Sequence, residues 1–257
     1  SYEIDFIILW LLIDKFKGLG SSRGFVKNEL KYVPIWGWFF GLAGHIFLQR
    51  SFEKDRKLIE DKVRDYLTNI ENNWLVLLAE GTRFSLEKHA VGEKFAKERN
   101  LEPLKHHLIP RARGFAVTVP ILKKLNCPTL YNVQLAFDKN APHQATLGTL
   151  LRGQKIVAHV YIDRISMEKV EPTFEYLYDL YKEKDAMMES FNNFGNFFEG
   201  RKENVLNGIK MEVRQTVKIN SIFWIAFIFC CIMYQAIQLI LAGQIMFLLG
   251  TSTAVIS

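Results

Sequence analysis

The sequence predicts an α/β layered domain followed by a C-terminal membrane segment. Short apolar runs typical of strands alternate with longer segments whose apolar residues recur at helical spacing, as in a sheet covered by helices. Residues 219–257 contain no Asp, Glu, Lys, Arg or His, and they include the run IFWIAFIFCCIMYQAIQLILAG. This run is long and apolar enough for a membrane-spanning helix. The 257 residues suffice for one such domain with this appendage.

The first half of the chain should contain two helices and three strands. Residues 6–17 predict a helix, and RGFVK (23–27) and HIFLQ (45–49) predict short strands. Residues 52–71 predict an amphipathic helix, because apolar side chains recur along one face. These are Leu58, Ile59, Val63, Tyr66, Leu67 and Ile70. The unbroken apolar run WLVLLA (74–79) predicts a fully buried strand.

The second half should continue the alternation of helices and strands. Residues 86–99 predict a charged helix, and LYNVQLAF (130–137) and KIVAHVYI (155–162) alternate as half-buried strands do. Residues 173–191 predict a further helix, and FNNFGNFFEG predicts a loop toward the membrane segment. We therefore expect a folded domain over residues 1–200, a basic juxtamembrane linker over 201–218 and hydrophobic membrane segments over 219–257.

The charged residues suggest an orientation for the predicted membrane segment. One span is expected at about 219–241, and a buried core hairpin is the alternative. Five basic residues precede the span and none follows it, so the positive-inside rule places residues 1–218 in the cytosol. They are Arg201, Lys202, Lys210, Arg214 and Lys218.

Overall charge and cysteine content narrow the class of protein. The net charge of +6 suits a partner with anionic headgroups or phosphate groups. Nucleic acid is not expected as a partner, because the sequence has no basic stripe with interleaved aromatic residues. Cys127 stands alone and Cys230-Cys231 lie in the apolar run, so no disulfide framework and no metal site are expected.

The string WLVLLAEGTRFS carries the strongest chemical signal. Glu80, Gly81, Thr82 and Arg83 follow a predicted strand at its carboxyl end, where ligands bind in open α/β sheets. Glycine permits close backbone approach, threonine offers a hydroxyl and can begin the next helix, and arginine suits a phosphate or carboxylate. The glutamate can hold the arginine or accept a hydroxyl. The alternative is a strand-end turn with an exposed Glu–Arg pair.

Two further cations follow predicted strands. Arg50 ends GHIFLQR, and Lys27 ends RGFVK. Because a phosphate dianion is well served by convergent cations, both are candidate substrate-binding residues beside Arg83. Each is alternatively a solvated charge at the end of a strand.

These motifs, in this order, resemble the glycerolipid acyltransferases of the lysophosphatidic acid acyltransferase family. GHIFLQR resembles the second of the family's four motifs, EGTR the third, and LKHHLIPRARGF, with Pro110, the fourth; VTVPIL around Pro120 is the alternative fourth motif. KNELKYVPIWGW, RSFEKDRKLIED and the distal YLYDLYKEKDAMMESF resemble the gamma, delta and epsilon branch. Leu78-Ala79 departs from the usual aromatic–proline pair. The resemblance covers about residues 1–200 and implies a glycerolipid acyltransferase-like fold.

The family's first motif is Asn-His, four residues and Asp. Four residues precede Asp5, so the resemblance implies that Asp5 is the catalytic aspartate and that the motif histidine falls immediately before Ser1. No histidine of this chain has an aspartate five residues later. We therefore expect the chain as written to be inactive without upstream residues. Asp5 is alternatively a carboxylate that caps the first helix.

The resemblance also implies the reaction. An acyl chain would move from acyl-CoA, a co-substrate, to the free hydroxyl of lysophosphatidic acid, giving phosphatidic acid without a metal or cofactor. The histidine would take the hydroxyl proton, the aspartate would orient it, and arginine would bind the phosphate. The implied location is the endoplasmic reticulum membrane, with the catalytic domain facing the cytosol. The alternatives are another lysophospholipid acceptor, such as lysophosphatidylinositol or lysocardiolipin, and a non-catalytic membrane lipid-binding homologue.

Overall fold

The computed structural model divides the chain into two compact units, Ser1–Arg201 and Lys202–Ser257. It describes residues 4–34, 36–49, 51–69, 73–138 and 141–198 in the first unit, and residues 229, 232–234 and 237 in the second. Among these residues no helix is both long and apolar enough to cross a membrane. Most of the span expected at 219–241, and the basic residues before it, lie outside the described residues.

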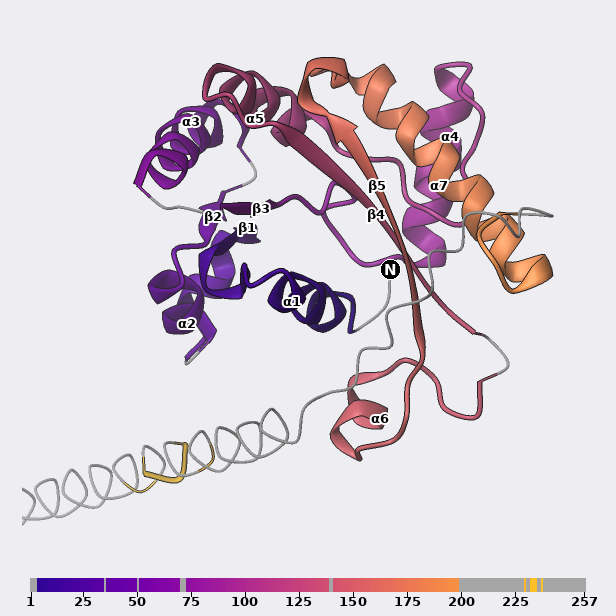
Figure 1. Cartoon of the computed structure of the whole chain (residues 1–257), viewed down its shortest axis with the longest axis horizontal. Coiled ribbons are helices and arrows are strands. Elements are labelled where there is room, and N and C mark those ends of the chain that lie inside the picture. The colour runs from indigo at the N-terminus through magenta and orange to yellow at the C-terminus, as the bar shows by residue number, and fades with distance from the viewer. Residues whose placement is uncertain are drawn as a thin grey trace, which may run out of the picture. The chain divides into compact units, whose positions relative to one another are not determined.

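A three-stranded parallel sheet forms the centre of the N-terminal half. Its strands β1 (Ser22–Lys27), β2 (Ile46–Leu48) and β3 (Trp74–Val76) are ordered β2-β1-β3. Parallel neighbours need crossover connections, which α2 (Trp36–Leu42) and α3 (Phe52–Asn69) provide. In the view of Figure 1, α3 and α5 (Ala112–Lys124) lie above these strands, and α1 (Asp5–Lys15) and α2 lie below them. The predicted layered α/β arrangement is confirmed.

A second sheet consists of two antiparallel strands. β4 (Thr129–Phe137) and β5 (Ala158–Ser166) pair along their full length, from Thr129 opposite Ser166 to Phe137 opposite Ala158. The connection between them contains the short helix α6 (Leu147–Leu151), and Figure 1 shows these strands as a long ribbon with α6 near one end. Both strands were predicted, although β5 begins three residues later than expected.

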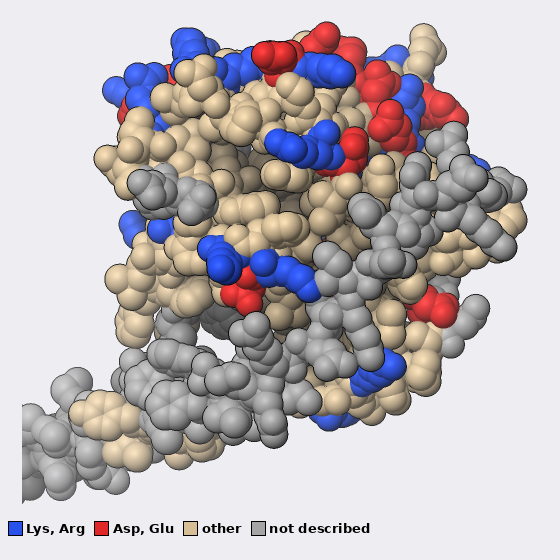
Figure 2. Space-filling view, viewed as in Figure 1, with Lys and Arg blue, Asp and Glu red and all other residues tan. Residues whose placement is uncertain are grey.

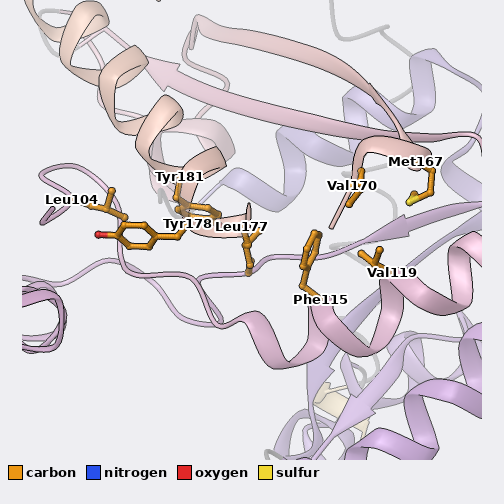
Figure 3. Packing of buried hydrophobic residues seen from close by; sticks show 9 residues of the cluster. Leu104, Phe115, Val119, Met167, Val170, Leu177, Tyr178 and Tyr181 are labelled. Carbon is orange, nitrogen blue, oxygen red and sulfur yellow. The ribbon is translucent and has the colours of Figure 1, made fainter. Parts of the chain in front are cut away.

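The main core joins α5 to α7 (Phe174–Phe194). Figure 3 shows Leu177, Tyr178 and Tyr181 of α7 in one row with Phe115 and Val119 of α5. Fully burying side chains of this size contributes about 1.5–3 kcal/mol each. Ala79 belongs to the same cluster, so the end of the β3 segment is fixed against this core. A second cluster packs α3 and α5 against the parallel sheet through Ile46, Ile59, Val63 and Ile121.

Three local predictions need correction. The segment WLVLLA pairs only at Trp74–Val76 and is half-buried there rather than fully buried. Helix α7 continues to Phe194, into the segment expected to be a loop. Helix α5, which the sequence did not predict, includes Val117, Val119 and Pro120, residue types that disfavour helices; burial of its apolar face overrides this preference.

Candidate functional site

The turn after β3 requires glycine at position 81. Gly81 has a φ of +65°, and its N–H donates to the carbonyl oxygen of Leu78 at 3.0 Å. A Cβ at this position would lie 3.1 Å from Cδ of Arg111. Glycine is therefore needed both for the turn and for close approach of the chain's own Arg111.

Thr82 and Arg83 lie on the loop that leads into α4 (Leu86–Glu98). The ammonium of Lys88 donates to Oγ1 of Thr82 at 2.7 Å and to the carbonyl oxygen of Arg83 at 3.2 Å. Ser85, rather than Thr82, is the N-cap of α4. The side chain of Arg83 is exposed, where it can meet an anion from solvent.

The carboxylate of Glu80 is half-buried and has three charged or titratable neighbours. Burial raises its pKa; nearby His107 and Lys184 lower it, and Asp5 raises it further. Among the described side chains, no ion pair joins Glu80 to Arg83. The structure therefore directs Glu80 inward, toward other elements, and Arg83 outward.

Asp5 and Glu80 interact electrostatically although α1 and β3 are far apart in sequence. Asp5 is half-buried in the first turn of α1, whose N-cap residue is Ile4. Its carboxylate is close enough to influence the pKa of Glu80. The structure thus brings together the aspartate of the expected first motif and the glutamate of EGTR.

Helix α7 contributes two side chains that the sequence analysis missed. Tyr181 is buried and hydrogen-bonds to the backbone of Glu80, and burial raises its pKa. Burial lowers the pKa of Lys184 to about 8, although nearby Glu80 opposes this shift. Nζ of Lys184 lies 5.2 Å from the centroid of the Tyr181 ring. The sequence does contain a signal for Lys184, because it lies three residues after Tyr181 and four before buried Met188, on the same apolar face of a helix.

Asp185 fixes the loop before Pro110. Its carboxylate accepts the backbone N–H groups of Lys105 and His106 at 2.7 Å and that of His107 at 3.1 Å. Its Oδ1 also lies 3.1 Å from Nδ1 of His107. Burial alone would raise the pKa of Asp185, but these hydrogen bonds outweigh it and lower the pKa. The loop that leads to Pro110 is therefore tied to α7.

Pro110 and Lys27 also lie near the turn. Pro110 is buried, and the next residue, Arg111, donates its N–H to the carbonyl oxygen of Ala79 at 2.7 Å. Lys27 is exposed at the carboxyl end of β1, and parallel pairing places it at the same sheet edge as the loop after β3. Arg50 lies outside the described residues. Within the described chain, no cluster of three or more His, Cys, Asp or Glu is placed to hold a metal.

These contacts define an inner and an outer part of the site. The inner part holds Asp5, Glu80, His107 and Lys184, which are able to orient a base and control its charge. The outer part exposes Arg83 and Lys27 at the same sheet edge, where an anionic group can bind. The arrangement suits a reaction that removes a proton from a substrate with a phosphate group.

Comparisons with known proteins agree with this chemistry. Residues 1–114 match the family model described as Acyltransferase, and residues 149–224 match the model described as Acyltransferase C-terminus. The chain is 37% identical over 203 residues to 1-acyl-sn-glycerol-3-phosphate acyltransferase delta of Bos taurus and 36% identical to that of Homo sapiens. It is 35% identical over 201 residues to the gamma protein of Homo sapiens. Each match covers 77% of this chain and 53% of the relative, so the chain spans about half the length of these proteins. No solved structure matches the chain.

Proposed function

Because the chain belongs to the acyltransferase family, in the gamma and delta branch of the lysophosphatidic acid acyltransferases, we propose that the full-length protein acylates lysophosphatidic acid. Acyl-CoA is the proposed donor and phosphatidic acid the product. The names of the relatives support the acceptor. The proposal also places the enzyme on the endoplasmic reticulum membrane, with its catalytic domain facing the cytosol.

The proposal is supported by the match of residues 1–114 to the Acyltransferase model, together with the electrostatic interaction between Asp5 and Glu80, the first residue of EGTR. In the proposed mechanism Asp5 orients the imidazole of the histidine that the family's first motif would place before it, with four residues between the two. The imidazole removes the hydroxyl proton as the acceptor oxygen attacks the thioester carbonyl. When the carbon–sulfur bond breaks, the coenzyme A thiolate leaves and takes the proton from the imidazolium. Asp5 stabilises that imidazolium.

The cations at the sheet edge have the second role in this mechanism. The side chain of Arg83 is exposed to solvent. Lys27 is at the end of β1, at the same edge of the parallel sheet. We assign both to the acceptor phosphate, together with Arg50. A phosphate held there fixes the distance between the acceptor hydroxyl and the base, and such orientation lowers the barrier substantially.

The test is acyl-CoA-dependent conversion of lysophosphatidic acid by the full-length protein and four variants. Arg83→Ala should lower kcat/KM for the acceptor by about 10- to 150-fold, the loss expected for charge-assisted hydrogen bonds of roughly 1.5–3 kcal/mol. Asp5→Asn should lower kcat by roughly 10²- to 10⁴-fold, because the imidazole is no longer held in the productive tautomer. Arg64→Ala is the matched control, since Arg64 is exposed on α3.

The outcomes separate the alternatives. Arg83→Lys should restore only part of the rate, because lysine cannot form the bidentate contact. Turnover of lysophosphatidylinositol in preference to lysophosphatidic acid would replace the acceptor, and an inactive full-length protein would favour a lipid-binding role. Equal acceptor kinetics for Arg83→Ala and Arg64→Ala would remove Arg83 from the phosphate site.

A further inference from the structure

A short stretch below the parallel sheet exposes five large apolar side chains. Between residues 32 and 42 the exposed fractions are 76% for Tyr32, 39% for Val33, 61% for Trp38, 47% for Phe39 and 91% for Leu42. We call these five side chains the aromatic front. Trp38, Phe39 and Leu42 share one side of α2, because residues three and four apart are neighbours on a helix. Single exposed apolar residues are ordinary, but a contiguous group marks an interaction surface.

The aromatic front is fixed to the rest of the fold. The N–H of Gly37 donates to the carbonyl oxygen of Val33 at 2.8 Å, and a Cβ on Gly37 would lie 2.2 Å from the carbonyl oxygen of Lys31. The ring of Phe39 packs edge-on against Trp10 of α1, with centroids 6.1 Å apart. The exposed side chains therefore belong to a preformed surface, with α2 pressed closely against the segment before it.

Lysine side chains border the aromatic front. Lys27 and Lys31 precede it, Lys15 ends α1, and Lys17 follows α1; all four are exposed, as are the acidic Asp14 and Glu29. In the described part of the chain, neither Lys27 nor Lys31 forms an ion pair. Residues 32–49 contain no Lys, Arg, Asp or Glu. Aromatic side chains with lysines at their border match the interface of a bilayer with anionic headgroups.

The opposite side of the fold differs in character. Figure 2 shows charged side chains of both signs gathered along the upper edge of the face in view, the side on which Figure 1 places α3, α5 and α7. Helices α1 and α2 lie below the sheet in that view. Fewer charged side chains appear in the lower half of that view, and the exposed apolar side chains of α2 lie on the side below the sheet.

The aromatic front is also connected to the site. Helix α1 begins at Asp5, and its Phe6 and Trp10 rings lie edge to face, 5.3 Å apart. Trp10 in turn contacts Phe39 of the aromatic front. A chain of aromatic contacts therefore runs from the first turn of α1, which carries Asp5, to the exposed surface of α2.

We propose that the aromatic front docks the first unit onto an anionic lipid bilayer, through a contact separate from residues 219–257. Trp38, Phe39 and Leu42 enter the headgroup region, and Lys31 lies against lipid phosphates. The docked surface presents the Asp5 end of α1 to lipids within the membrane. Docking itself does not depend on the proposed function; the consequence that the acceptor enters from the bilayer rests on that function.

Site-specific quenching by lipid tests the docking. The full-length protein has its native cysteines replaced by serine, including Cys127, Cys230 and Cys231. It carries an environment-sensitive fluorophore at Leu42→Cys or, as matched control, at Leu86→Cys of α4. Leu42 and Leu86 are 91% and 81% exposed, so neither label disturbs the core. In vesicles with about one third anionic lipid and brominated acyl chains, the label at position 42 should be quenched at least about threefold more strongly. Equal quenching at the two positions would overturn the proposal.

The same labels distinguish two other ways in which the aromatic front could be covered, by a second copy of the protein or by residues of the same chain. Energy transfer between labels at position 42 in dilute vesicles would show that a second copy covers it. A label at 42 that is shielded from both brominated lipid and aqueous iodide would show that residues of the same chain cover it. Either result overturns the proposal. Lys31→Glu should reduce the quenching at position 42, because the anionic headgroups then repel the carboxylate beside the aromatic front.

Kinetics connect docking to the proposed function. Trp38→Ser with Leu42→Ser should lower turnover of a long-chain acceptor embedded in vesicles and leave turnover of a short-chain, water-soluble acceptor unchanged. Equal losses on both acceptors would show that the substitutions act on the fold or the site instead, and would overturn the delivery role. If the parent protein converts neither acceptor, the proposed function fails, while the quenching result still decides the docking.

Discussion

At the scale of single residues, Lys184 is held at a cost to stability. Its pKa is lowered to about 8 because burial disfavours the charged ammonium, and only the nearby carboxylate of Glu80 partly offsets this effect. A group whose charged form is disfavoured in the fold destabilises the protein at any pH at which the group is charged. A residue with such a cost, placed beside Glu80 of EGTR, is expected to have a role in the site.

Replacement of Lys184 by methionine should therefore stabilise the fold and weaken the activity. Below pH 8 the folded parent carries the buried charge, so Lys184→Met should raise the free energy of unfolding at pH 7 by roughly 1–3 kcal/mol. The parent's stability rises between the folded pKa of about 8 and the unfolded value of 10.5, so the difference should shrink over that window. Urea unfolding in detergent at pH 7 and pH 9.5 measures this difference in the free energy of unfolding between Lys184→Met and the parent.

Lys182→Met is the matched control for this experiment. Lys182 is exposed on the same helix and pairs with Asp179 at 2.7 Å, so its loss should change stability little. A Lys184→Met protein that is less stable than the parent at pH 7 would contradict the argument. An acyl-transfer rate equal to that of the parent would show that Lys184 has no role in the site.

The site residues proposed from the sequence are those that follow local rules. Glu80 and Gly81 were identified because a turn after a strand has a recognisable sequence, and Asp5 because it fits a spaced motif. Lys184 and Asp185 were missed because their roles depend on contacts with residues far away in the chain, such as the hydrogen bond from Lys105 to Asp185. Local patterns do not report such contacts, although the helical spacing of Lys184 within an apolar face was visible.

At the scale of elements, prediction succeeded where one periodicity dominated the segment. Helix α3 and strands β4 and β5 were recognised because their apolar residues repeat at 3.6 or 2 residues. Helix α5 was missed because it contains Pro120 and residues that favour strands, and its packing on α3 and α7 decides its conformation. Helix α2 is short and has two glycines, which disfavour a helix in isolation.

The two glycines of α2 should respond oppositely to substitution. Gly37→Ala would place a Cβ 2.2 Å from the backbone carbonyl oxygen of Lys31, so we expect it to destabilise the protein by roughly 1–3 kcal/mol. Gly41→Ala meets no described atom within 4 Å and should leave stability unchanged or raise it by up to about 1 kcal/mol. Thermal unfolding of both variants measures this, and equal effects would contradict the close packing of α2.

At the scale of the whole molecule, the site draws on both matched regions of the chain. Asp5 and Glu80 belong to residues 1–114, which hold the parallel sheet, and Lys184 and Asp185 belong to residues 149–224, which hold β5 and α7. The separate ribbon of β4 and β5 was predicted as two strands but not as a sheet of its own, because pairing between distant strands leaves no local signal. The core cluster in which Ala79 and Leu104 pack with Leu177, Tyr178 and Tyr181 joins the two regions.

The first unit should fold without the second. Because Ser1–Arg201 forms one compact unit that contains each described core cluster, we expect residues 1–201 to unfold in one cooperative transition. The midpoint should lie within about 3 °C of that of the corresponding transition in the full chain, since a difference of 1 kcal/mol shifts it by a few degrees. Calorimetry of both proteins in detergent measures this, and a broad transition in the fragment would show that Lys202–Ser257 contributes to the fold.

The hydrogen bonds of Asp185 also set the order in which the newly made protein is completed. The amide of Lys105 is made 80 residues before the carboxylate that it binds. At about 5–20 residues per second, the ribosome delivers Asp185 roughly 4–16 s after Lys105. During that interval the loop before Pro110 has no anchor, and Glu80 lacks both Tyr181 and Lys184. The nascent chain therefore gains its site only after α7 has left the exit tunnel, however early the parallel sheet forms.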